Sequence, residues 1–83
     1  MRLKDGIVFN KIENEGVLFN QENGHFYSLN EIASRIIENM LSGKDVDGIV
    51  DVLSSEYDSE RTAIFEDVKS YIKEIREMGL LLD

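Results

Sequence analysis

The chain has 83 residues, a formal net charge of −8 and no cysteine. Its length suits one compact domain with a modest core. The 42% of hydrophobic residues, placed periodically, favours a folded unit over a disordered segment. The lack of cysteine excludes disulfides, thiolate metal ligands and a cysteine nucleophile. An acidic surface repels phosphates, so we expect no nucleic-acid partner.

The sequence also argues against a membrane location. No apolar run approaches the roughly 18 residues of a membrane span. Residues 1–6 are charged and lack the apolar run of a signal peptide. We therefore expect a cytoplasmic protein without a membrane partner.

The first third of the chain predicts a small sheet. Segments 7–12 and 17–20 are rich in β-forming residues, with a turn sequence at 14–16 between them. A third, short strand follows after residue 24. Residues 7–29 therefore predict a three-stranded antiparallel sheet.

The turn before the third strand predicts a register. Asn23-Gly24 is the favoured dipeptide of a two-residue hairpin, because both positions tolerate positive φ. With that turn, Leu18 pairs with Leu29.

After residue 30 the apolar residues recur at the helical period, which predicts three helices. Their expected ranges are about 30–42, 46–57 and 60–78. Asn30, Asp45 and Asp58-Ser59 are suited to cap them, and Gly79 is suited to end the last one. The layout predicts one α+β domain over residues 1–83.

No catalytic constellation is present. His25 is the only histidine, and a lone histidine beside aromatics in a strand is interpreted as a surface or packing residue. The serines have no neighbouring base. Asp45, Asp47 and Asp51 lack the spacing of a calcium loop. We expect no enzyme activity, no metal and no cofactor.

A winged helix-turn-helix that binds DNA is an alternative interpretation of the three helices. The basic residues of the last helix are interleaved with acidic ones, a pattern typical of a solvated face. The alternative stays open, but a basic footprint is missing.

The third strand, "HFYS" at 25–28, has none of the proline or lysine residues that usually protect a sheet edge. Its edge is suited to the addition of an extended peptide. The other interpretation is a short strand whose Phe26 and Tyr27 point to opposite faces.

Three segments in order, "GHFYSLNEIASRI", "SEYD" and "EDVKSYIKEIREMGLL", resemble the PqqD-like family, the leader-peptide recognition domains of ribosomal peptide biosynthesis. The resemblance implies a winged-helix-like fold of three strands and three helices. It also implies that the leader of a precursor peptide adds antiparallel to the third strand, in the groove between that strand and the third helix.

Carried over to this chain, the resemblance implies a set of peptide-binding residues. On the strand they are His25, Phe26, Tyr27 and Ser28; on the helix, chosen by helical spacing, they are Phe65, Val68, Lys69, Ile72, Lys73 and Arg76. The three basic residues of the helix are expected to steer acidic leader residues.

The predicted function is a binding module that delivers a precursor leader to a separate protease or radical enzyme. Service to a lasso-peptide-type protease is favoured. The alternatives are PqqD proper, in pyrroloquinoline quinone biosynthesis, a DNA-binding winged helix, and a structural subunit whose sheet edge completes a partner's sheet.

Overall fold

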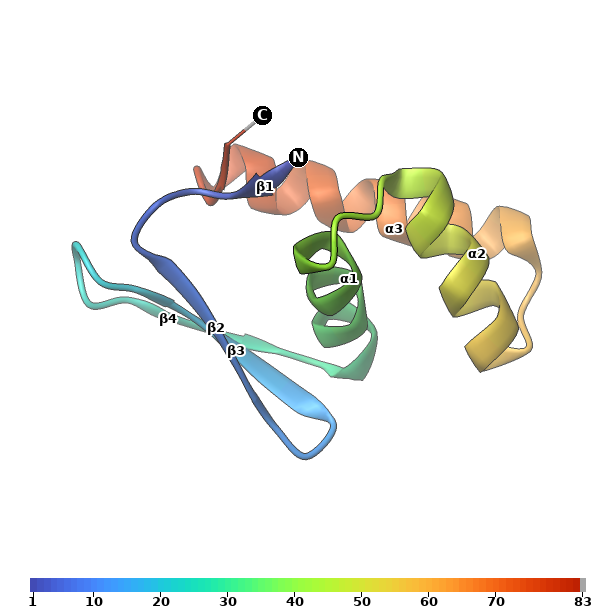
Figure 1. The fold of residues 1–83 in the computed structure, drawn as a ribbon, viewed down its shortest axis with the longest axis horizontal. Helices are drawn as coiled ribbons and strands as arrows, with labels where there is room; N and C mark the ends of the chain where they lie inside the picture. The colour runs from blue at the N-terminus through green and yellow to red at the C-terminus, as the bar shows by residue number, and fades with distance from the viewer. Residues whose placement is uncertain (83) are drawn as a thin grey trace.

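The computed structural model describes residues 1–82. In chain order its elements are β1 (Arg2–Leu3), β2 (Ile7–Ile12), β3 (Glu15–Asn20), β4 (Phe26–Leu29), α1 (Glu31–Leu41), α2 (Val46–Tyr57), α3 (Arg61–Glu77) and β5 (Leu81–Leu82). Strands β2, β3 and β4 form an antiparallel sheet in that order, and three helices follow (Figure 1). The predicted α+β class is confirmed.

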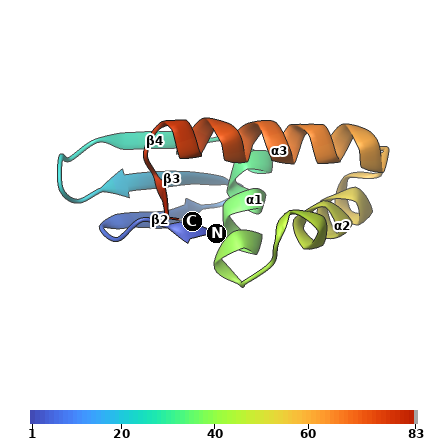
Figure 2. The ribbon, with the colours of Figure 1, turned by 90° about the horizontal axis from the view of Figure 1, so that it is seen from above.

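The helices cover one side of the sheet and extend beyond it. Helix α1 lies between the sheet and α2, and α3 runs from α2 back to the sheet (Figure 1). Seen from above, the C-terminal half of α3 lies on the β4 side of the sheet, opposite β2 (Figure 2). No helix within residues 1–82 combines the length and the apolar character that crossing a bilayer requires.

The helix caps follow the predicted pattern at two of three positions. The Asn30 side chain accepts a hydrogen bond from the Ala33 N–H at 2.8 Å, and Asp45 accepts one from Gly48. Asp58 does not cap α3. It has a φ of 46° and ends α2 in the left-handed conformation, so α3 begins after Glu60 without a side-chain cap.

The register of the β3–β4 hairpin differs from the prediction. Leu18 pairs with Tyr27 rather than Leu29, because the loop has four residues, 21–24. Of the two loop residues chosen for positive φ, only Gly24 has it, so the two-residue turn does not form. The Asn20 side chain instead accepts from the Glu22 N–H at 2.9 Å. A shift of two residues keeps every side chain on its predicted face.

A second, two-stranded sheet joins the two ends of the described chain. Gly79 has a φ of 79° and ends α3 as predicted, and Leu81–Leu82 then pairs antiparallel with Arg2–Leu3. This pairing was not predicted from the sequence. Residues 81–82 therefore pair with β1 and not with β4.

The core lies between the inner face of the sheet and the helices. Its buried apolar residues are Leu18, Leu29, Ala33, Ile36, Ile37, Met40, Ile49, Val50, Leu53, Ile64, Val68, Ile72, Ile75, Leu80 and Leu81. All three helices contribute, so burial of their apolar stripes holds the helices and the sheet together.

Helix α1 approaches β3 closely at Gly16. A Cβ atom at this position would lie 2.6 Å from the Ser34 Oγ of α1 and 2.6 Å from the Phe9 Cε1 of β2. Only glycine fits there without displacing its neighbours. The Ser34 hydroxyl is fully buried and has no hydrogen-bond partner among the described residues.

Gly16→Ala should lower the free energy of unfolding by about 1–3 kcal/mol, because the new methyl overpacks the contact between α1 and β3. Ser34→Ala alone should change stability little, since its hydroxyl is unpartnered. In the Gly16→Ala background, Ser34→Ala should recover part of the loss. Urea unfolding of the four proteins measures the coupling; strictly additive effects would contradict the proposed contact.

Candidate functional site

Strand β4 is paired on one side only. Among residues 1–82 its partner is β3, and the other edge faces no strand. The Asn20 N–H donates to the His25 carbonyl at 2.9 Å, which makes this a hydrogen-bonded pair. Because such pairs alternate along an antiparallel ladder, Phe26 and Ser28 direct their N–H and C=O groups toward the free edge.

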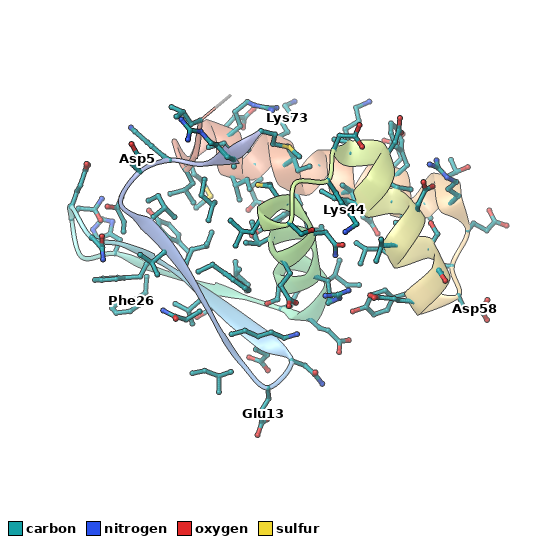
Figure 3. All side chains as sticks on the ribbon, in the orientation of Figure 1. Asp5, Glu13, Phe26, Lys44, Asp58 and Lys73 are labelled. Atoms are coloured by element: carbon teal, nitrogen blue, oxygen red, sulfur yellow. The ribbon has the colours of Figure 1, made fainter. Side chains whose placement is uncertain are left out.

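The side chains of β4 alternate between two environments. Leu29 is buried and Tyr27 is half-buried on the face toward the helices. Phe26 is 69% exposed on the opposite face, where its ring stacks on Phe19 with centroids 4.6 Å apart (Figure 3). A strand added at the free edge would therefore meet the helices on one face and Phe26 on the other.

Two hollows lie between β4 and α3. One, of about 440 Å³, is lined by Ser28, Leu29, Asn30, Ile32, Ala33, Ile36, Asp67, Tyr71 and Glu74. The other, of about 220 Å³, is lined by Leu18, Tyr27, Ser28, Leu29, Tyr71, Glu74, Ile75, Met78 and Leu80. The first lies toward the end of β4 that precedes α1, and the second toward the C-terminal end of α3.

Tyr71 lines both hollows, at the middle of α3. Its hydroxyl is buried and has no hydrogen-bond partner among the described residues. Burial, with a smaller contribution from the negative charge of Glu74, raises the pKa of Tyr71 to about 12. The phenol is therefore neutral at physiological pH and has a hydrogen-bond donor to offer.

The helix side of the groove is acidic. Asp67 and Glu74 are exposed at its rim, and no lysine, arginine or histidine lines either hollow. Lys11, Arg35 and Arg61 form salt bridges with other carboxylates, namely Glu38, Glu56 and Asp51.

The chain matches the family model described as coenzyme PQQ synthesis protein D (PqqD) over residues 15–81. It belongs to the PqqD family. The resemblance found in the sequence is thereby confirmed. A comparison with curated protein sequences gave no match.

Two solved structures are similar to this PqqD-family chain over nearly its whole length. "TbiB1 in Complex with the TbiA(beta) Leader Peptide" is 27% identical, with a TM-score of 0.90 and coverage of 100% of both chains. "Lasso peptide synthetase B1 complexed with the leader peptide" is 28% identical, with a TM-score of 0.89, and the match covers 99% of this chain and 96% of that one.

The PqqD-family fold places three of the four predicted strand residues, Phe26, Tyr27 and Ser28, in β4. His25 directly precedes the strand, after the four-residue loop. Its carbonyl already accepts from the Asn20 N–H, so this carbonyl is not part of the free edge.

The six predicted helix residues do not line the two hollows beside β4. Val68 and Ile72 are core residues, with 0% and 3% exposure. Lys69 and Lys73 are two positions from Tyr71, which places them about 160° away around the helix; Figure 3 shows Lys73 on the side of α3 away from β4.

The remaining two predicted residues, Phe65 and Arg76, also lie elsewhere on α3. Phe65 lines a shallow hollow near the start of the helix, and Lys69 Nζ lies 5.6 Å from its ring centroid. Arg76 is exposed. The two hollows beside β4 therefore lie against a different face of α3.

That face carries Asp67, Tyr71, Glu74 and Met78, which sequence reasoning did not select. Their spacing of i, i+4, i+7 and i+11 is a helical stripe next to the core stripe. The sequence did carry one indication of this stripe, because an aromatic residue and a methionine alternate with carboxylates at helical spacing. The apolar core stripe beside it masked that signal.

Phenolate absorbance should show one tyrosine that titrates near pH 12, above the ordinary value of about 10. Tyr71→Phe should remove this late step. The pKa of Tyr71 is higher in the folded state than in the unfolded state. Its contribution to the free energy of unfolding is therefore fully present below pH 10 and is lost as the pH rises toward 12. The stability of wild type should thus fall more steeply over this interval than that of Tyr71→Phe. Parallel pH profiles would contradict the burial of this phenol.

Proposed function

We propose that this PqqD-family protein captures the leader of a ribosomally made precursor peptide by strand addition to β4. The observation that carries the proposal is the unpaired edge of β4 beside the two hollows under α3. The two similar structures, both described as leader-peptide complexes, support it. A cytoplasmic setting, where ribosomes release precursors, fits this role.

Backbone pairing would set the register of the leader. The two outward-facing residues, Phe26 and Ser28, offer two N–H and two C=O groups. Four hydrogen bonds at about 1 kcal/mol each contribute roughly 4 kcal/mol. Association itself costs an estimated 4–15 kcal/mol or more, and micromolar affinity requires about −8 kcal/mol overall. Pairing alone therefore gives weak binding.

An apolar anchor would supply most of the affinity. Apolar burial contributes about 25 cal/mol per Å². The hollow lined by Leu18, Tyr27, Ile75, Met78 and Leu80 offers such a surface next to the strand edge. Every second side chain of an added strand points to the helix face, so one or two leader side chains reach the hollow.

The bound leader would be presented to a separate processing enzyme, because this chain shows no catalytic constellation in its sequence. A lasso-peptide-type protease is the favoured partner, since one similar structure is a lasso peptide synthetase B1. Titration of the protein into a fluorescein-labelled leader of the precursor encoded beside its gene tests capture by fluorescence anisotropy. Saturable binding supports the proposal, and a flat titration against every such leader rejects it.

Ser28→Pro should weaken leader binding by about tenfold or more, because it removes an N–H at the free edge and adds a ring there. The fold should persist, since β3 does not use this N–H and proline is tolerated on edge strands. Ser28→Ala, which keeps the N–H, is the matched control and should bind like wild type. Anisotropy measures both, with circular dichroism to check folding. Equal affinities would argue against strand addition at β4.

Met78→Ser should weaken leader binding more than Lys73→Ala does, by about threefold or more, because Met78 lines the apolar hollow and Lys73 does not. Met78 is 43% exposed in the free protein, so the substitution should disturb the fold little. The two dissociation constants measured side by side decide the ranking. A larger loss with Lys73→Ala would place the leader on the opposite face of α3.

A further inference from the structure

We infer that the leader which binds this chain carries lysine or arginine residues just N-terminal to its apolar anchor. The inference rests on the proposed function and adds the chemical character of the ligand. It replaces the expectation, made from the sequence, of an acidic leader steered by the basic residues of α3.

Acidic side chains gather at one end of the groove. Asp67 and Glu74 lie on the α3 side of the larger hollow, and Glu74 also borders the smaller one. Glu15 and Glu31 line a further depression beside Ser28, Leu29 and Asn30, at the same end of β4. Carboxylates thus reach the last part of the strand from α3, from β3 and from the start of α1.

The surrounding cations do not neutralise this end. No lysine, arginine or histidine lines the two hollows or the depression. Lys11 and Arg35 pair with Glu38 and Glu56, and Arg61 pairs with Asp51. Lys69 and Lys73 project from the far side of α3, about 160° from Tyr71. Within residues 1–82 the groove therefore presents a single sign of charge.

The direction of the added strand fixes which part of the leader meets which part of the groove. In antiparallel addition to β4, the N-terminal part of the leader lies beside Leu29 and Asn30, and its C-terminal part lies beside Phe26. The first part meets the acidic end, and the second meets the apolar hollow of Tyr27, Met78 and Leu80. The order in the leader is therefore basic, then apolar.

Acidic residues alone would say little, because charged side chains on a helix are ordinarily solvated. Here they flank the unpaired edge of β4 and a hollow that Tyr71 lines. The Tyr71 hydroxyl has no hydrogen-bond partner among residues 1–82. A cation held there gains from several carboxylates at once. Such rim charges act mainly on the association rate and on partner choice.

The ligand side is tested with three versions of one fluorescein-labelled leader, that of the precursor encoded beside the gene. In the first version the lysine and arginine residues that precede the apolar anchor are kept; in the second they are serine, and in the third glutamate. The dissociation constant should rise about three- to tenfold from the first to the second, and further for the third. Higher salt should reduce these differences, because it screens exposed charges.

The protein side is tested by charge reversal. Asp67→Lys with Glu74→Lys should weaken binding of the basic leader and strengthen binding of the glutamate version, so that their ranking inverts. Glu66→Lys with Glu77→Lys is the matched control: it makes the same charge change on α3, at exposed positions outside both hollows. The control should preserve the ranking, because only the position of the charge differs.

The outcomes separate the two levels of the proposal. Inversion with the groove variant but not the control supports the inference. If all three leaders bind wild type equally, or if both variants change the ranking alike, the inference is overturned while leader capture stands. Tight binding of a native leader without basic residues in that segment overturns it too. If no leader version binds wild type, the proposed function itself fails, and the inference fails with it.

Discussion

Helix α1 can lie directly against β3 only because residue 16 is a glycine, with Ser34 and Phe9 each 2.6 Å from where a Cβ would be. Through this contact α1, which follows β4 in the chain, packs on the inner face of the sheet. With α1 on that face, the C-terminal half of α3 lies along the β4 side of the sheet (Figure 2). The hollows between β4 and α3 follow from this order of packing.

The tail of the chain could have closed the edge of β4, and the fold uses it elsewhere. Leu81–Leu82 pairs with Arg2–Leu3, and the Lys4 N–H donates to the Leu80 carbonyl at 2.9 Å. The same pairing anchors the C-terminal end of α3. Within residues 1–82 this small ribbon thus fixes the end of the helix, while the edge of β4 beside it stays unpaired. Backbone groups and apolar surface then lie together, which suits a ligand that needs both a register and an anchor.

Local chemistry made part of this structure predictable. Asn30 and Asp45 cap helices because their side-chain oxygens accept hydrogen bonds from the free N–H groups of the first helical turn. The hairpin register was not predictable, because the side chains of Asn20 and Asn23 accept hydrogen bonds within the loop and replace the two-residue turn. The face of α3 that lines the hollows was not selected from the sequence, because Tyr71 and Met78 border the core stripe and spacing alone does not tell a groove from a core.

Position carries more information about function than total charge does. A net charge of −8 supports only a general expectation about phosphate ligands. The informative observation is the part of the surface where all charges have the same sign. Lys69 and Lys73 lie on the side of α3 opposite Tyr71, while Asp67 and Glu74 stand at the groove with Tyr71 between them. A groove of one sign repels like-charged chains and favours oppositely charged ones, and this is the physical basis of the proposed preference for a basic leader.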